Sequence, residues 1–232
     1  MVRVILENVF VLHTKPYRDS SLLVDLFSRQ YGRVKVVARS ARGPKSRFKG
    51  QLQPFTSLLA SWSGRSELKS LSQLEVHGVA YELPGDCLLC AFYLNELMVR
   101  LLKLEDPCVA LFDLYQTTLD RLDAGQDVHD TLRVFETTLL TQLGYGLRWD
   151  KEAYNGHDIL PDQWYRYESE VGFVLQQSHS ESEQLILGEV LLALAQSTPM
   201  PAHYRAQAKG LLRLIISEQL GGRPLKSRDL MR

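Results

Sequence analysis

The residues with the clearest chemistry are a run of cations that no acid interrupts. From Arg29 to Arg65 the chain carries nine Lys or Arg residues, and no Asp or Glu lies between Asp25 and Glu67. Such clusters bind polyanions, because each phosphate that they neutralise releases condensed counterions. The alternative is a solvated face on which cations only provide solubility, but such a face would be expected to carry an acid or two. We therefore expect this run to bind nucleic acid.

The spacing of these cations predicts one cationic face. In the segment 32–40, Arg33, Lys35 and Arg39 stand at odd positions, and apolar residues stand between them. In a strand this alternation turns the cations away from the core. The residues expected to hold nucleic-acid backbone are Arg33, Lys35, Arg39, Arg42, Lys45, Arg47, Lys49 and Arg65. Tyr31, Phe48 and Phe55 are nearby candidates for stacking on bases, although we expect Phe48 and Phe55 to be core residues.

The charge of the whole chain hides this asymmetry. Residues 1–78 hold 13 Lys and Arg against 5 Asp and Glu, whereas residues 79–232 hold 14 against 22, so a net charge of +8 cancels one of −8. A difference of this size between two parts of a chain indicates a polyanion-binding module in the basic part.

A second basic cluster lies near the C-terminus. Arg205, Lys209 and Arg213 are spaced to line one face of a helix, and several Leu and Ile residues between 211 and 216 cover much of the rest. A cationic stripe beside an apolar groove suits an acidic peptide with hydrophobic anchors. Equally, cations near a helix C-terminus can simply complement its dipole. The sequence leaves both interpretations open.

Signatures of catalysis and of metal binding are missing from the sequence. No nucleotide-binding, nucleophile-elbow or zinc-protease motif occurs, and the six histidines are scattered. Cys87 and Cys90 form a C-x-x-C, but Cys108 stands apart and no histidine pair accompanies them, so we interpret the pair as apolar residues at a packed helix start. A carboxylate nuclease centre would need converging acids that the basic region lacks. We expect no enzymatic activity, no cofactor and no metal.

The pattern of the elements predicts an α+β fold. Five short runs before residue 78 have strand character, with turn residues between them, and predict a small β-barrel of the OB-fold type. After Leu83-Pro84-Gly85 the period becomes helical. Helices are expected at 87–104, 106–122, 128–143, 183–196 and 202–219, with a last turn after Pro224. The expected domains are 1–80, the OB-fold barrel, and 81–232, a mostly helical domain with an irregular insert near 146–182 that contains a hairpin from 164–167 and 172–175.

The N-terminal residues lack the apolar core of a secretory signal, and no window approaches the roughly 18 apolar residues of a membrane span. The odd number of cysteines also argues against a disulfide framework. These features predict a cytoplasmic protein.

Several stretches together resemble the RecO family of bacterial recombination mediators, most closely its gamma-proteobacterial form. They are FVLHTKPYRDSSLLVDLFSRQYGRVKVVARSAR, LQPFTSLL, FYLNEL, RVFETTLLTQLGYG and GGRPLKSRDL, and they occur in one order across residues 9–230. Some relatives carry a four-cysteine zinc module, but residues 147–167 contain no cysteine here, which again predicts a chain without zinc.

The resemblance implies a protein of DNA repair and recombination. It implies binding of single- and double-stranded DNA, annealing of complementary strands, association with the nucleoid, and contacts with RecR and with the acidic C-terminal tail of single-strand-binding protein, which help to load RecA. Candidates for holding that tail are Arg133, Lys209, Arg213, Lys226 and Arg228. The alternative function is that of an RNA-binding or scaffolding OB-fold protein without a role in recombination, whose basic strip would look the same.

Overall fold

The computed structural model describes residues 2–145, 147–176 and 185–230. Its contacts divide the chain into two compact units. Unit 1 combines Met1–Gly125 with Leu225–Arg232, and unit 2 is Gln126–Pro224. These units are defined by contacts within the folded chain and do not test the domain boundary expected near residue 80, which stays a prediction.

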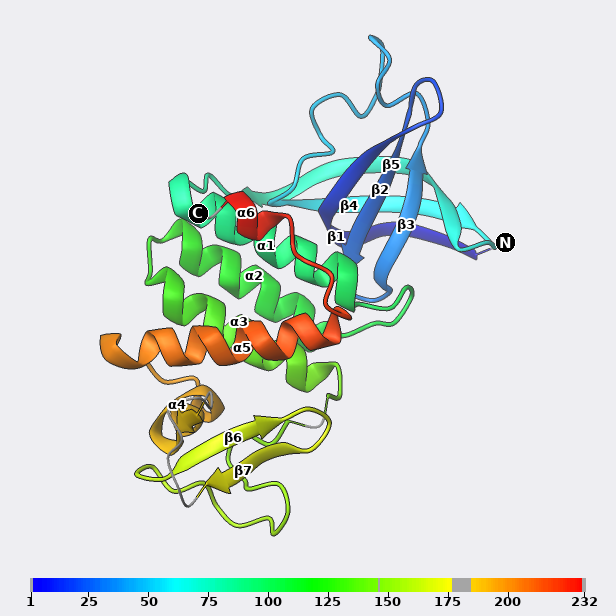
Figure 1. Cartoon of the computed structure of the whole chain (residues 1–232). Helices are drawn as coiled ribbons and strands as arrows, with labels where there is room; N and C mark the ends of the chain where they lie inside the picture. The colour runs from blue at the N-terminus through cyan, green and yellow to red at the C-terminus, as the bar shows by residue number, and fades with distance from the viewer. Residues whose placement is uncertain (1, 146, 177–184, 231–232) are drawn as a thin grey trace. The chain divides into compact units, whose positions relative to one another are not determined.

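Unit 1 contains a closed five-stranded barrel (Figure 1). Its strands are β1 (Val2–Tyr17), β2 (Ser21–Ser28), β3 (Gly32–Ala38), β4 (Thr56–Gly64) and β5 (Leu68–Ala80). They follow the order β1-β2-β3-β5-β4, and β4 pairs back with β1. Only the β3–β5 pair is parallel among these strand pairs. This arrangement is that of the OB-fold and confirms the predicted fold class, α+β with an N-terminal barrel.

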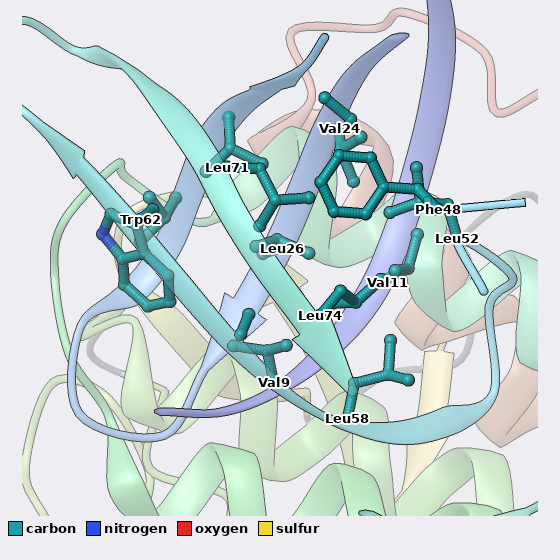
Figure 2. Packing of buried hydrophobic residues seen from close by; sticks show 14 of the residues in the cluster. Val9, Val11, Val24, Leu26, Phe48, Leu52, Leu58, Trp62, Leu71 and Leu74 are labelled. Carbon is teal, nitrogen blue, oxygen red and sulfur yellow. The ribbon is translucent and has the colours of Figure 1, made fainter. Parts of the chain in front are cut away.

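Alternating apolar residues fill the barrel, as the two-residue period of a strand requires. Every strand contributes side chains to one buried cluster. Figure 2 shows several of them meeting in the interior, among them Val11, Val24, Leu58 and Leu71. The loop between β3 and β4 also contributes, because Phe48 and Leu52 point into the same cluster and are 3% and 7% exposed. A long cationic loop is thus fixed to the barrel by an apolar anchor.

Two helices and a C-terminal segment complete unit 1. They are α1 (Gly85–Leu101), α2 (Val109–Asp123) and α6 (Ser227–Leu230). Asn95 of α1 is buried and donates a hydrogen bond to the carbonyl of Leu12 in β1, while its own Oδ1 accepts from Tyr115 of α2. One amide therefore joins the barrel to both helices. The second helix begins three residues later than Asp106, where the proline pattern predicted its start.

Residues Leu225–Leu230, which we call the C-terminal strap, pack on α1 (Figure 1). The carboxylate of Glu96 accepts hydrogen bonds from the backbone N–H groups of Lys226 and Ser227, at 3.0 and 2.8 Å. Leu225 is 2% exposed. The strap is therefore held both by burial of an apolar side chain and by a charged acceptor at the start of α6.

Unit 2 combines helices with a small sheet. Its helices are α3 (Val128–Gln142), α4 (Gly188–Gln196), the 3-10 turn η1 (Ala202–Tyr204) and α5 (Arg205–Gln219). Its sheet has the order β7-β6-β8, formed by β6 (Trp164–Glu168), β7 (Gly172–Gln176) and β8 (Leu185–Leu187). The hairpin predicted at 164–167 and 172–175 is present as β6 and β7.

One helix prediction in unit 2 was wrong at its start. Residues 185–187, expected to be helical, pair with β6 as β8, and the helix begins only at Gly188; residues 183 and 184 lie outside the described residues. The N–H groups of Gly188 and Glu189 bond to the carbonyls of Gln163 and Pro161. These long-range bonds stop the helix from extending backward, and local periodicity does not reveal them. In the described part of the chain, no helix is long and apolar enough to cross a membrane.

Candidate nucleic-acid interface

Strand β3 divides its side chains between the core and the outer face of the barrel. Val34, Val36 and Ala38 are almost fully buried, as the alternation predicts. Lys35 lies on the outer face, where its Nζ is 3.6 Å from a carboxylate oxygen of the exposed Glu67. Since this ion pair is solvent-exposed, it costs little to exchange the carboxylate for another anion. Lys35 thus remains part of a cationic outer face.

Arg33 differs from the other cations of β3. Its side chain is 11% exposed, its guanidinium donates a hydrogen bond to the carbonyl of Val99 in α1, and one nitrogen lies 3.8 Å from Asp25 Oδ1. Because the guanidinium is enclosed by these acceptors, it joins the barrel to α1 instead of facing solvent. The structure therefore does not place Arg33 on the outer cationic face with the other predicted residues.

The loop after β3 is tied to the turn between β1 and β2. The side chain of Arg42 donates hydrogen bonds to the carbonyls of Arg18 and Asp19, at 2.7 and 2.5 Å, and its backbone N–H bonds to the carbonyl of Ser20. Figure 1 shows the two segments rising from the same end of the barrel. Arg42 therefore shapes the cationic surface, and its guanidinium remains exposed.

The remaining loop cations surround a buried anchor. Lys45, Arg47 and Lys49 are exposed, whereas Phe48 between them is inside the barrel. The guanidinium carbon of Arg47 lies 4.8 Å from the centre of the Phe48 ring. Phe55 is also buried, so both phenylalanines are core residues, as expected. With these side chains unavailable for stacking, the loop contributes charge and shape.

A groove of about 570 Å³ lies on the barrel between these segments. It follows the parallel seam of β3 and β5 and reaches the β1–β2 turn and the end of β4. The residues lining it are Tyr17, Arg18, Ser21, Val37, Arg39, Ser40, Ser63, Gly64, Leu68, Lys69 and Ser70. Arg39, predicted from sequence, lies in it. Serine hydroxyls and arginine side chains can bind phosphate oxygens, and the apolar Val37 and Leu68 among them can contact the faces of bases.

The charges in the groove belong mainly to two arginines. Lys69 is 7% exposed, and its Nζ lies 2.6 Å from Glu105 and donates to the carbonyl of Ser66, so its charge is internally compensated. Among the described residues, Arg18 and Arg39 have no ion-pair partner. Sequence reasoning missed Arg18 and Tyr17 because they precede the acid-free run. In the structure Tyr17 ends β1 and Arg18 opens the turn to β2.

Two further cations of the basic run have different surroundings. Arg65 is exposed in the turn between β4 and β5, where a bound strand could reach it. Arg29 forms a bidentate pair with Asp113 of α2, with both hydrogen bonds at 3.1 Å. That hydrogen-bonded carboxylate raises the pKa of Arg29. Acids from later segments of the chain therefore lie beside the acid-free run in the folded protein. Arg29 is paired with one of them, Asp113 of unit 1.

The residues predicted to hold an acidic tail are divided between the two units. In unit 2, Lys209 and Arg213 are exposed on α5. Arg133 of α3 is 10% exposed on its side chain and pairs with the buried Glu136 at 3.0 Å. Arg205, the first cation of the stripe, pairs with Asp127 at 3.0 Å. The charge of Arg205 is therefore already paired, and Lys209 and Arg213 are the exposed cations of the α5 stripe.

An apolar groove of about 300 Å³ also uses α5. Leu211 and Leu214 line it together with Ile186 of β8, and Leu214 is 37% exposed. In unit 1, Lys226 is exposed, and the guanidinium carbon of Arg228 lies 5.7 Å from the centre of the Tyr93 ring.

Among the described residues, no group of three or more His, Cys, Asp or Glu side chains is arranged to hold a metal ion.

Comparison with known proteins agrees with this architecture. Residues 1–79 match the family model "Recombination protein O N terminal", and residues 85–229 match "Recombination protein O C terminal". A protein of Coxiella burnetii strain RSA 331 is 46% identical over 99% of this chain and 98% of its own length. Proteins of Methylococcus capsulatus and Aliivibrio salmonicida are 43% and 39% identical over 99% and 97% of this chain, and over 94% of their own lengths. All three are named "DNA repair protein RecO".

The barrel and its groove define an OB-fold protein, a class whose barrels bind oligonucleotides or oligosaccharides on one face. The two family matches cover both parts of the chain, and the relatives cover nearly all of it. The chain belongs to the recombination protein O family. The resemblance noted in the sequence is thereby confirmed.

Proposed function

We propose that this protein is a recombination mediator that acts by binding, without catalysing a reaction. Its barrel binds single- and double-stranded DNA without reading sequence. The observation that supports this most is the groove lined by Arg18 and Arg39 and flanked by the exposed cations of the 39–55 loop. A DNA-repair role for relatives that match nearly the whole chain supports the choice of DNA as the polyanion.

Annealing follows from the same surface. Two complementary strands repel one another through their phosphates, and a surface that neutralises both lowers that repulsion. The cations available for this purpose are the half-buried Lys35 and the exposed Arg39, Arg42, Lys45, Arg47, Lys49 and Arg65. Binding of this kind needs no nucleotide and no metal. It takes place on chromosomal DNA in the cytoplasm.

The helical part is proposed to bind the acidic tail of single-strand-binding protein. The terminal carboxylates would pair with Lys209 and Arg213, and an apolar residue of the tail would enter the groove beside Leu211 and Leu214. Lys209 and Arg213 share α5 with this groove but do not line it, so a bound tail would have to pass around the helix to contact both. Contact with RecR belongs to the same proposal and assists the loading of RecA.

The test is annealing of complementary oligonucleotides coated with single-strand-binding protein, with and without the last residues of that protein. We expect annealing without ATP or metal that depends on the tail. Annealing of naked strands alone would support the proposed DNA-binding surface and contradict the proposed binding of the tail. If neither assay shows annealing and the protein prefers RNA, the RNA-binding or scaffolding alternative replaces the proposal.

The position of the tail has its own test. Lys209→Glu/Arg213→Glu should weaken binding of a tail peptide about tenfold or more, whereas Lys226→Glu in unit 1 should leave it unchanged. Fluorescence anisotropy with a labelled peptide measures both. The reverse order of effects would place the binding site for the tail in unit 1. Equal affinity for all variants would mean that neither group of residues binds the tail.

A further inference from the structure

The barrel groove combines two kinds of surface. Val37 and Leu68 contribute apolar side chains from β3 and β5, the two strands that form its parallel seam. Arg18 and Arg39 contribute cations from the β1–β2 turn and the residue after β3. Apolar side chains beside cations fit a nucleic-acid strand whose bases face the protein and whose phosphates lie beside the arginines.

The groove contains an aromatic side chain that the charge pattern did not reveal. Tyr17 is the aromatic among the described residues that line it. The other candidates for stacking have different contacts: Phe48 and Phe55 are buried, and Tyr31 packs edge-on against Trp62 with ring centres 5.5 Å apart. A base in the groove would therefore meet Tyr17 rather than the aromatics within the basic run.

The surroundings of Tyr17 hold it in place. It is the last residue of β1, and its Cα partner across the turn is Ser21 of β2, which also lines the groove. The guanidinium carbon of Arg18 lies 5.3 Å from the centre of the Tyr17 ring. Arg42 fixes the intervening turn through the carbonyls of Arg18 and Asp19. A ring positioned in this way loses little conformational entropy when a base stacks on it.

We propose that the groove takes single-stranded DNA, with an unpaired base stacked on Tyr17 and adjacent phosphates beside Arg18 and Arg39. The proposal rests on the DNA binding proposed above and adds a preference. In a duplex each base is already stacked and paired, so Tyr17 gains no base, and duplex binding depends on the cations alone. Tyr17 is thus the residue that distinguishes single strands from duplexes.

Three probes of equal length separate stacking from charge: a thymidine oligonucleotide, an oligomer of abasic sites with the same phosphates, and a duplex. Tyr17→Leu should lose about tenfold in affinity for the thymidine oligonucleotide, as expected for loss of one base stack. Its affinity for the abasic oligomer and the duplex should not change. Tyr17→Phe keeps the ring and should bind all three probes as the unaltered protein does.

Tyr31→Leu is the matched control, because it removes a partly exposed barrel tyrosine that does not line the groove. It should leave all three affinities unchanged. An equal loss for Tyr17→Leu on thymidine and abasic probes would overturn the proposal, since the ring would then act on the shape of the turn. So would an unchanged affinity for the thymidine probe.

Two additional measurements keep the result decisive. If Tyr17→Leu does not fold, 2-aminopurine placed in turn at each position of the oligonucleotide reports on the unaltered protein. Quenching at one or a few positions supports stacking, and no quenching at any position contradicts it. Arg39→Glu should weaken binding of all three probes. If it weakens none, the proposed DNA surface itself fails, independently of Tyr17.

Discussion

Among the cations, the same residue type has two different roles within one short segment, 33–39. Arg33 and Arg39 belong to the same segment and the same predicted face, yet one guanidinium is enclosed by Asp25 and Val99 and the other lines the groove. A buried charge depends on its partner for stability, whereas an exposed one contributes to the potential that attracts anions. Substitution should therefore separate the two roles.

Arg33→Met should lower the free energy of unfolding by about 3 kcal/mol, because it leaves the buried Asp25 carboxylate without its cation. Arg39→Met should change stability by less than about 0.5 kcal/mol, as is usual at an exposed position. Denaturant unfolding measures both.

DNA binding should show the opposite order. Arg39→Met should weaken binding and reduce the salt dependence of the binding constant by about one unit of slope. Arg33→Met, in the folded protein, should change neither. If Arg33→Met reduces the salt slope as much as Arg39→Met does, its guanidinium contacts phosphate and the sequence-based assignment was right.

What the sequence predicts at this scale is the direction of a side chain, not its partner. Period two placed Val34 and Val36 in the core, and both are buried. The partners of Arg33 and Arg29 could not be predicted in the same way, because Val99 and Asp113 come 66 and 84 residues later. The number of cations in the acid-free run is therefore larger than the number that remain unpaired on the folded barrel.

At the scale of elements, the turn between β2 and β3 lies against the segment that joins α1 to α2. Gly32 has a φ of +64°, and a Cβ at this position would lie 2.1 Å from the carbonyl oxygen of Asp106. The N–H of Glu105 also bonds to the carbonyl of Arg33 at 2.9 Å. Backbone thus meets backbone with no room for a side chain.

Gly32→Ala should destabilise the protein by about 3 kcal/mol or more, because it adds a clash with rigid backbone to the strain of a positive φ. Gly50→Ala is the matched control: its φ is +75°, and no atom lies within 4 Å of a Cβ there. It should lose only about 1 kcal/mol. Equal losses in thermal unfolding would show that the close approach does not matter.

The C-terminal strap gives a second prediction at this scale. Burial raises the pKa of Glu96, but the N–H groups of Ser227 and Lys226 and the charge of Arg100 outweigh it, so the pKa is lowered overall. A carboxyl whose pKa is lower in the folded state stabilises the protein above its unfolded pKa. That stability is lost as the pH falls through the folded pKa.

Glu96→Gln should therefore lower stability by about 1.5–3 kcal/mol at neutral pH, the usual value of hydrogen bonds to a charged group. The difference from the unaltered protein should shrink as the pH falls through the folded pKa. Amide hydrogen exchange at Lys226 and Ser227 should accelerate in the variant. Glu82→Gln, at an exposed carboxylate, is the control and should do neither.

Element prediction succeeded where local pattern determines the structure. Five strands and the hairpin in unit 2 follow from alternation and turn residues. The strand at Leu185–Leu187 was mistaken for helix, since its pairing with β6 is fixed by residues 164–166. Neither the groove nor the docking of the C-terminal strap could be predicted from a local window, since both assemble segments that are distant in sequence.

At the scale of the whole molecule, unit 1 is discontinuous. Its first segment ends at Gly125, unit 2 intervenes, and Leu225–Arg232 returns to complete it. The strap contributes a buried leucine and two hydrogen bonds to α1. Stability of unit 1 therefore depends on residues that follow the whole of unit 2.

Removal of everything after Pro224 should destabilise unit 1 by about 2–4 kcal/mol, the cost of losing a buried leucine and its neighbours. Hydrogen exchange should accelerate in α1 and leave α3 and α5 unchanged. Leu225→Ala, which keeps the strap, should show a smaller effect of the same kind. Uniform acceleration across both units would mean that they unfold as one.

The return of the strap also sets an order of events during synthesis. The ribosome makes the barrel first, then α1 and α2, and these must wait for the 99 residues of Gln126–Pro224 before the strap emerges. A barrel that forms early is present while α1 still exposes the surface that the strap will cover. A chain that stops short of the strap would keep the groove but leave that surface of α1 exposed, and a locally less stable helix is more open to proteolysis.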